Sequence, residues 1–383
     1  MCIRDSIDLD KKIDISFEAA CEQFRSMFIQ SVQRRLRSDV PVGSSLSGGL
    51  DSSSIVRVIN ETRGESHIQN TFSARFRNFE KDEGKYMQYV VDGTNINAHY
   101  TWVEPNYIVD SFEQICHHQE EPFGSTSIVA QHAVMRLAKE KDVTVLLDGQ
   151  GADEYLAGYV KRYYKTYLKE LYGHSDKKTF AEERLAYNDY FNRNFEGGLK
   201  LGLELQTKGM VQKARNLKYR YFERQPAHLN NEFSKSVRDI VYPMKKFYDL
   251  KEQLKFSIQY QLPDLLRYAD RNSMAFAREI RLPFLNHDLV EFVFALPHSY
   301  KLNKGWSKYI LRKSLESYLP EPIAWRKEKV AFQPPQNRWI ETKKFQNLIG
   351  DAKALLAKER IIQPNNISKQ FDWQCLLSAQ LFA

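Results

Sequence analysis

The sequence has 383 residues, of which 42% are apolar, 27% charged and 13% aromatic. This composition is that of an ordinary globular protein with two or three domains, and it excludes a largely disordered chain. The net charge of +8 suits an anionic ligand but is spread along the chain, so it does not indicate nucleic-acid binding. The four cysteines include no C-x-x-C pair and make no disulfide framework. With neither an apolar run of eighteen residues nor a secretory signal, we expect a cytoplasmic protein that does not bind membranes.

The first 150 residues alternate between helical and strand-like patterns. From Ser16 to Arg37, apolar residues recur at helical spacing and basic residues close the segment. After it, short apolar runs bounded by turn residues alternate with further helical patterns. The expected strands are 40–46, 71–76, 97–103 and 143–147, and the expected helices are 51–61, 83–91, 107–119 and 127–141.

Strands that alternate with helices predict an α/β protein with a mostly parallel, doubly wound sheet. Beyond Tyr155 strand signals become rare and prolines interrupt the chain, so we expect a largely helical C-terminal part. We divide the chain into an N-terminal segment with one helix (1–37), an α/β unit (38–160) and a helical remainder that completes the ligand site (161–383). Ligands of such sheets bind at the carboxyl ends of the strands.

A turn rich in serine and glycine, Ser47–Ser53 (SGGLDSS), follows the first expected strand and precedes a helix. Two glycines let successive backbone N–H groups converge on an anion, and the helix directs its positive end to the same place. Ser47, Ser52 and Ser53 add hydroxyl donors, and Asp51 can cap the helix or hold Mg²⁺ beside a phosphate. A plain Gly-Gly turn with an Asp or Ser cap is the alternative. The combination favours phosphate binding, although no Walker-type Gly-Lys-Ser follows.

A second glycine turn, Gly149–Glu154 (GQGADE), follows the fourth expected strand. It would face the first turn across the sheet, so that Asp51 and Asp153 offer oxygen ligands to Mg²⁺ ions that bridge phosphates. Glu154 is a weaker candidate for the same role. Alternatively, Asp153 and Glu154 only cap the next helix.

Five stretches, in family order over about residues 16–345, resemble the synthetase domain of asparagine synthetase B-type enzymes. The first, Ser47–Ser53, resembles the pyrophosphate loop of enzymes that cleave ATP to AMP and pyrophosphate. The fold of these enzymes is described as ATP-pyrophosphatase or adenine nucleotide α-hydrolase-like. The others are Leu147–Glu154 with Gly158-Tyr159, Arg267–Met274, Glu279–Leu285, and Lys308–Arg312 leading to Arg326–Lys329 and Phe332.

The resemblance implies ATP and Mg²⁺ as cofactors and assigns roles to individual residues. Lys308 and Lys329 match two lysines that the family places against the ATP phosphates and the acyl-adenylate, although the spacing from Arg326 leaves Lys327 as an alternative to Lys329. Ala331 stands where glycine is usual. ATP would be bound by Leu46, Ser47, Gly48, Gly49, Asp51, Ser52, Ala74, Asp148 and Gly149, and metal by Asp51 and Asp153.

Three further positions depart from the family pattern. Asp148 replaces a Ser or Thr, so its contact with ATP is expected through the backbone. Gln150 stands where a glutamate is usual, and Asn286 where an aspartate is usual. A glutamine orients a ligand but cannot act as a general base. Because Gln150 and Asn286 fall near the expected acceptor site, the substrate carboxylate can differ from aspartate.

Two other features carry no predicted site. Cys116-His117-His118 resembles a set of metal ligands, but neighbouring helical positions point about 100° apart, so we expect no metal there. Met1-Cys2 resembles the N-terminal cysteine of glutamine-hydrolysing amidotransferases. The segment before Ser47 is too short for a glutaminase domain, and we interpret Met1–Ser6 as a remnant of truncation or assembly, with the glutaminase half in the full-length protein.

The sequence therefore predicts an ATP-dependent ligase. It would activate a small carboxylate, first of all aspartate, as an acyl-adenylate with release of pyrophosphate, and ammonia would then give the amide and AMP. The alternatives are a ligase of the same fold for another acceptor or amine, a tRNA-modifying enzyme with the same phosphate loop, and a degenerate nucleotide-binding regulator.

Overall fold

The structure is a computed structural model that describes residues 7–64, 68–174, 176–192, 194–221, 229–236, 246–327, 333–363 and 367–382. Contacts divide the chain into two compact units. One comprises Met1–Trp102, Ala133–Leu205 and Phe247–Phe332, and the other comprises Val103–His132, Gln206–Lys246 and Gln333–Ala383. The three-part division expected above follows sequence character instead of contacts and stays a prediction.

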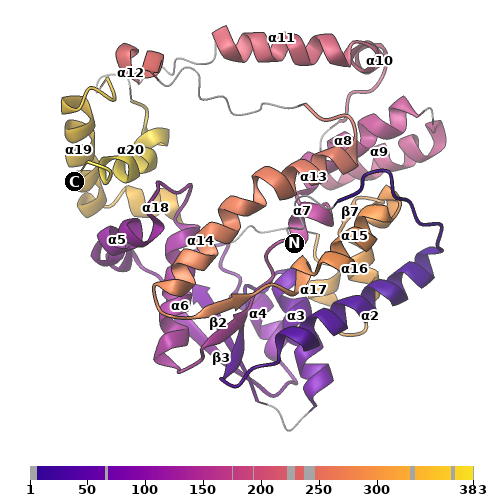
Figure 1. The fold of residues 1–383 in the computed structure, drawn as a ribbon, viewed down its shortest axis with the longest axis horizontal. Helices are drawn as coiled ribbons and strands as arrows, with labels where there is room; N and C mark the ends of the chain where they lie inside the picture. The colour runs from indigo at the N-terminus through magenta and orange to yellow at the C-terminus, as the bar shows by residue number, and fades with distance from the viewer. Residues whose placement is uncertain are drawn as a thin grey trace. The chain divides into compact units, whose positions relative to one another are not determined.

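The first unit is built on a five-stranded sheet in the order β3-β2-β1-β4-β5. Strands β2 and β3 of this sheet are labelled in Figure 1. All neighbouring strands of this sheet are parallel. The α/β fold with a parallel, doubly wound sheet is therefore confirmed, as are the four expected strands. The strands are β1 Val42–Ser45, β2 Gln69–Arg75, β3 Ile96–Trp102, β4 Val145–Leu147 and β5 Glu279–Arg281.

The topology brings the two glycine turns to one edge of the sheet. The chain moves outward from β1 to β2 and β3, then returns to place β4 on the other side of β1. In this register Ser44 of β1 lies opposite Leu147 of β4, so both strands end at the same level. This is the switch point at which parallel sheets bind ligands. All three residues of β4 are buried, as expected for a strand covered on both faces.

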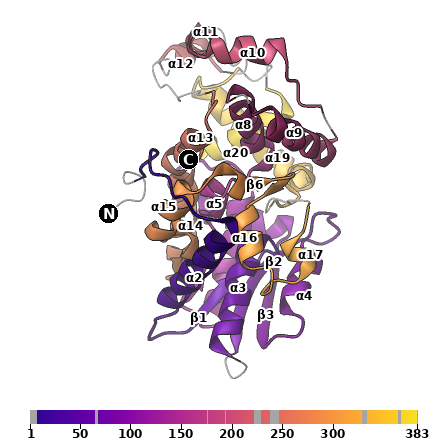
Figure 2. The same cartoon turned by 90° about the vertical axis from the view of Figure 1, so that its right-hand side faces the viewer.

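Helix α2 (Phe17–Arg35) shows why the predicted helices form. The hydroxyl of Ser16 accepts a hydrogen bond from the backbone N–H of Ala19 and caps the first turn. Ala20, Phe24, Phe28 and Val32 form a buried stripe at helical spacing. The helix packs against α3 (Leu50–Arg63), visible in Figure 2, and against α15 (His287–Ala295) and α16 (Tyr309–Ser314).

The remaining helices occur along the whole chain, and beyond Tyr155 helices make up most of the structure, as expected. The other helices that precede β5 are α4 Gly84–Val91, α5 Pro105–Gln119, α6 Ser127–Glu140, α7 Ala152–Tyr155, α8 Val160–Gly173, α9 Lys177–Phe191, α10 Leu199–Gln206, α11 Lys208–Tyr221, α12 Asn231–Ser236, α13 Leu250–Tyr260 and α14 Leu262–Met274. Those that follow it are α17 Glu321–Ala324, α18 Gln336–Ile340, α19 Lys343–Lys358 and α20 Asp372–Ala379, with short 3₁₀ turns η1 Pro283–Leu285, η2 His298–Tyr300 and η4 Lys369–Phe371.

Two strand features within this C-terminal part were not expected. Strand β5 has three residues, too few for an alternating pattern, and it becomes a strand by pairing with β4. Strands β6 (Leu302–Asn303) and β7 (Trp306–Ser307) form a hairpin whose turn residues, Lys304 and Gly305, both have positive φ. The hairpin places Lys308 directly after β7.

The second unit has its own aromatic core. The indole ring of Trp373 on α20 lies edge-on to the rings of Phe112 and Phe123, and its N–H donates to the carbonyl of Phe123. Helix α19 packs against α20. Across the described residues, no helix is both long and apolar enough to span a membrane.

Candidate active site

The turn between β1 and α3 has a backbone that only glycine fits at its tightest point. Gly48 has a φ of 77°, and a Cβ there would lie 2.9 Å from the Cβ of Tyr86 and 3.0 Å from the backbone nitrogen of Met87. The turn is therefore pressed against the start of α4. The hydroxyl of Ser52 lies 3.1 Å from both the backbone nitrogen and the hydroxyl of Ser47, which closes the loop on itself.

The first turn of α3 is open to an anion. Gly49 is its N-cap residue and supplies no side-chain hydrogen bond to the helix. The helix therefore keeps the positive N-terminal end that binds phosphates in other proteins. Ser53 is fully buried, and its hydroxyl has no hydrogen-bond partner in the protein. The phosphate-binding roles of Ser47, Gly48, Gly49 and Ser52 stay predictions.

The second glycine turn contacts the first, as the topology predicted. A Cβ on Gly149 would lie 2.9 Å from the Cβ of Asp51 and 3.0 Å from the backbone nitrogen of Ser52. A residue with a side chain would thus force the two turns apart. Gly149 is needed because the two turns approach each other backbone to backbone.

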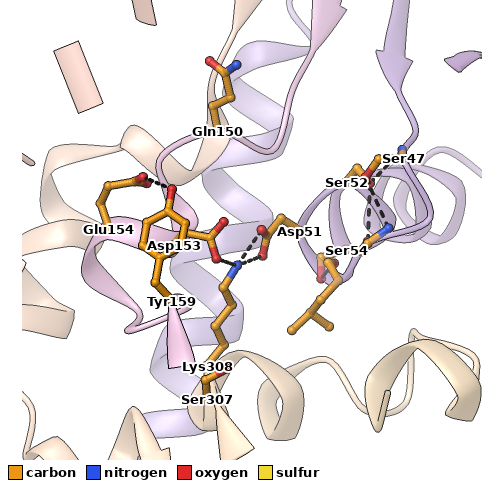
Figure 3. A network of polar contacts seen from close by, with 12 residues as sticks. Ser47, Asp51, Ser52, Ser54, Gln150, Asp153, Glu154, Tyr159, Ser307 and Lys308 are labelled. Atoms are coloured by element: carbon orange, nitrogen blue, oxygen red, sulfur yellow. Dashed lines mark hydrogen bonds and ion pairs between the residues drawn. The ribbon is translucent and has the colours of Figure 1, made fainter. Parts of the chain in front are cut away.

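Lys308 joins the carboxylates of the two turns (Figure 3). Its Nζ lies 2.6 and 2.5 Å from the two carboxylate oxygens of Asp51 and 2.7 Å from Oδ1 of Asp153. The Lys308 side chain is 5% exposed, against 19% for Asp51 and 21% for Asp153. Burial acts to lower the pKa of Lys308, but the charges of Asp153 and Asp51 outweigh it and raise the pKa, so the amine is charged.

The backbone around Lys308 is specialised to hold this position. Lys308 has a left-handed conformation, with a φ of 52°, and precedes the first turn of α16. Its N–H donates to the carbonyl of Leu156. A Cβ on Gly158 would lie 1.8 Å from Oδ1 of Asp153 and 2.3 Å from Cε of Lys308. Gly158 therefore leaves the space that this ion pair fills.

Glu154, the weaker metal candidate, lies in a different environment from Asp153. It is almost completely buried and accepts a hydrogen bond of 2.7 Å from the hydroxyl of Tyr159. Burial, and then the charge of Asp153, raise the pKa of Glu154 to about 7.

Leu46, Ala74 and Asp148, three of the residues expected to bind ATP, lie at the carboxyl ends of their strands. Leu46 and Ala74 are both 2% exposed. The backbone N–H of Asp148 donates to the carbonyl of Arg281 on β5, and burial raises the pKa of its carboxyl. Strand β5 thus helps to hold this end of β4. ATP binding by these residues stays a prediction.

The structure brings the segments of Gln150 and Asn286 together. A Cβ on Gly151, whose φ is 93°, would lie 2.3 Å from Cδ2 of Leu285, so the second turn touches the residue before Asn286. The side chain of Asn286 caps α15 by accepting from the backbone N–H of Leu289. Oε1 of Gln150 is buried and has no hydrogen-bond partner, and its side chain points away from Lys308 in Figure 3. A role for either residue in binding the acceptor stays a prediction.

Lys329 lies outside the described residues. Lys327 is described and exposed, and its backbone carbonyl accepts a hydrogen bond from the hydroxyl of Tyr190. The role of Lys329, with Lys327 as its alternative, stays a prediction.

Arg326 belongs to the site region, and sequence reasoning gave it no role. Its guanidinium pairs with Oε1 of Glu83 at 2.7 Å and stacks 3.4 Å from the ring centroid of Tyr86. Both contacts lie at the start of α4, where the backbone of Gly48 also packs. Arg326 and Glu83 are 243 positions apart in sequence, so no local sequence pattern predicts their contact.

The carboxylates of Asp51 and Asp153 fit a Mg²⁺ ion that shares its ligands with a nucleotide better than they fit a metal ion bound only by protein side chains. Among the described residues, no group of three or more His, Cys, Asp or Glu side chains is arranged to hold a metal ion. The carboxylates of Asp51 and Asp153 nevertheless both surround one cation, the Lys308 ammonium. Mg²⁺ in nucleotide sites commonly takes one or two carboxylates and completes its shell with phosphate oxygens and water.

Comparison with known proteins shows the family to which the chain belongs. The family model described as asparagine synthase matches residues 23–376. Asparagine synthetase (glutamine-hydrolyzing) 1 of Bacillus subtilis is 27% identical over 92% of this chain and 56% of its own length. A putative asparagine synthetase 2 of Methanocaldococcus jannaschii is 37% identical over 36% of this chain and 26% of its own, and amidase chyE of Penicillium rubens is 23% identical over 87% and 56%. The chain spans about half the length of the first two relatives it matches. The chain belongs to the asparagine synthase family.

Proposed function

We propose that this chain is an ATP-dependent amide-forming ligase that converts aspartate to asparagine. The observation that carries the proposal is the Lys308 ammonium held between Asp51 and Asp153, where the phosphate turn and the second glycine turn meet. Relatives named asparagine synthetases support aspartate as the acceptor.

In the first proposed step the substrate carboxylate attacks the α-phosphorus of ATP, and the bond to the bridging oxygen breaks to release pyrophosphate. The first turn of α3 and the N–H groups around Gly48 and Gly49 would hold the phosphates. Lys308, and Lys329 by resemblance, would neutralise negative charge that grows at the phosphorus and on the leaving pyrophosphate. Both lysines are proposed as catalytic residues.

Asp51 and Asp153 would hold Mg²⁺ at the same place. When bound, the ion would shield the charge of the phosphates and improve pyrophosphate as a leaving group. The protein's own contribution is to fix both carboxylates on adjoining turns, which Gly149 and Gly158 permit by having no side chain.

In the second step ammonia attacks the acyl carbon of the adenylate, the bond to AMP breaks, and the nitrogen loses a proton. Adenylation makes AMP a good leaving group, so positioning of the reactants does most of the remaining work. Gln150 is uncharged and cannot accept that proton, although it can donate hydrogen bonds to a bound carboxylate.

A ligase for a different acceptor is the second candidate. It is favoured by Gln150, an uncharged residue where the family pattern has a glutamate, whose buried amide oxygen has no hydrogen-bond partner in the protein. The turn that carries Gln150 touches Leu285, next to Asn286, so both departures from the family pattern would act on one acceptor site.

A substrate panel tests both candidates. The protein is incubated with Mg·ATP, ammonium and one amino acid at a time, and pyrophosphate, AMP and the amide are measured. We expect equal amounts of pyrophosphate and AMP with aspartate, together with asparagine. Turnover with another amino acid and not with aspartate would establish the second candidate. Absence of pyrophosphate with every carboxylate would overturn the proposed chemistry.

The origin of the ammonia and the location of the protein are also proposals. The relatives are named glutamine-hydrolyzing, so we propose that a glutaminase domain supplies ammonia in the full-length protein. A cytoplasmic location stays a prediction from the sequence.

A further inference from the structure

All three hydrogens of the Lys308 ammonium have acceptors inside the protein. An ammonium group carries three donors and no acceptor. Three carboxylate oxygens, two from Asp51 and one from Asp153, lie within 2.7 Å of Nζ. Lys308 can therefore donate to a phosphate only by giving up at least one of these hydrogen bonds.

The same oxygens are the ones that a divalent cation would need. Mg²⁺ and an ammonium both require carboxylate oxygens at close range, and the space around Lys308 is tight. A Cβ on Gly158 would already overlap both Oδ1 of Asp153 and Cε of Lys308. A second cation would also meet strong repulsion from the first in this largely buried place. Lys308 and a divalent cation thus compete for one pair of carboxylates.

We propose that Lys308 is an internal counter-ion that keeps a divalent cation from binding until the phosphates of ATP draw its ammonium away from Asp51 and Asp153. This rests on the proposed function, because the phosphates must reach the first turn of α3. The exchange makes binding of metal and nucleotide interdependent: each favours the other, and the bare cation binds weakly.

The test is Mn²⁺ binding without nucleotide, followed by electron paramagnetic resonance of the free ion. Lys308→Met keeps the length of the side chain and removes its charge, so we expect it to bind Mn²⁺ at least about tenfold more tightly than the wild type. Lys308→Arg keeps the charge and should bind Mn²⁺ as weakly as the wild type. Asp153→Asn combined with Lys308→Met should lose the gain.

Two results would overturn the proposal: equal Mn²⁺ affinity in Lys308→Met and the wild type, or a gain that survives the added Asp153→Asn. A purely structural ion pair predicts the first result, with loss of thermal stability alone. Circular dichroism checks that each variant is folded.

A wild-type measurement covers the case in which Lys308→Met does not fold. The ¹⁵Nζ resonance of Lys308, assigned through Lys308→Arg, should stay in place when Mg²⁺ is added alone. It should shift when Mg²⁺ is added with a non-hydrolysable ATP analogue. A shift with Mg²⁺ alone, or none with both, would contradict the proposal.

The outcome is separable from that of the proposed function. Wild-type release of pyrophosphate in the substrate panel, without a gain of Mn²⁺ affinity in Lys308→Met, would overturn only the counter-ion role. A gain of Mn²⁺ affinity with no pyrophosphate from any carboxylate would overturn the proposed function instead.

Discussion

Two glycines, at positions where a side chain would not fit, allow the charged groups of the site to approach one another closely. Gly149 lets the second turn touch Asp51, and Gly158 leaves room for Asp153 and Lys308. Neither glycine is at a position of positive φ, so steric overlap and not backbone strain is the reason for glycine there. Substitution at Gly158 therefore tests the positions of the charged side chains, whereas substitution at Gly149 would also push against the backbone of the first turn.

Gly158→Ala places a methyl group on the ion pair of Asp153 and Lys308 and should separate the two side chains. If the site works as proposed, pyrophosphate release should fall by about a hundredfold, because catalytic groups displaced by about 1 Å lose most of their effect. Gly350→Ala is the matched control: nothing lies within 4 Å of its added Cβ in α19. Equal activity of Gly158→Ala and the wild type would contradict the assignment.

Asp51→Asn removes one of the two charges that hold Lys308 and removes a proposed metal ligand. Pyrophosphate release should be lost while circular dichroism shows a folded protein. Asp142→Asn serves as the control, since Asp142 is exposed and has a φ of 55°, which asparagine adopts readily. Mg²⁺-dependent turnover that persists in Asp51→Asn would remove this residue from the site.

Helix α4 supports the phosphate turn, and Arg326 anchors to α4. The guanidinium of Arg326 pairs with Glu83 and stacks on Tyr86, whose Cβ lies under Gly48. Arg326→Lys keeps the charge but loses the planar stack, so KM for ATP should rise about tenfold. Glu83→Gln should raise KM for ATP through the same contact. The double variant should raise KM no more than either single variant does. Additive losses would show that the pair does not act as a unit.

The end of α2 is tied to β5 by Arg281, whose guanidinium donates to the carbonyls of Arg35 and Arg37 at 2.8 and 2.6 Å. The carbonyl of Arg35, in the last turn of α2, has no partner within the helix, and Arg37 lies just beyond the helix end. Arg281→Ala should lower the free energy of unfolding by about 1–3 kcal/mol, measured by urea denaturation. Glu279→Ala removes only the exposed ion pair to Arg281 and should change the unfolding free energy by less than about 1 kcal/mol.

The elements that sequence patterns predicted are those that carry their signal locally. β4 is an apolar run, α2 has a helical stripe and a serine cap, and the Ser47–Ser53 turn has its glycines in place. β5 could not be predicted because its strand character comes from pairing with β4. The partners of Asp51 and Arg326 were likewise hidden, because the pair of Lys308 and Asp51 spans 257 positions and that of Arg326 and Glu83 spans 243.

The stability of the whole chain should depend on pH through Lys301. Its side chain is fully buried and donates to the carbonyl of Leu296, and burial, helped by the charge of Lys251, lowers its pKa to about 7. Glu170, which also pairs with His298, opposes that shift. The unfolded chain keeps a proton on this amine up to about its ordinary pKa of 10.5. Between these values the unfolded state binds more protons, so stability rises with pH.

Urea denaturation at several pH values between the two pKa values should therefore show a rising free energy of unfolding for the wild type. Lys301→Met removes the titrating group and should flatten that rise. Parallel curves for the two proteins would mean that Lys301 is charged in the folded state.

At the scale of the whole chain, the proposed function predicts which compound supplies the amide nitrogen. The asparagine synthase match takes up residues 23–376, and the candidate site lies inside it. This 383-residue polypeptide should therefore form its amide with ammonium salts and not with glutamine. Because the attacking species is neutral ammonia, the rate at fixed total ammonium should climb from about pH 7 to about pH 9. Amide formation is measured by mass spectrometry with ¹⁵N-ammonium or amide-labelled glutamine. Glutamine that works as well as ammonium in the pure protein would place glutaminase activity within these 383 residues and overturn our interpretation of Met1-Cys2.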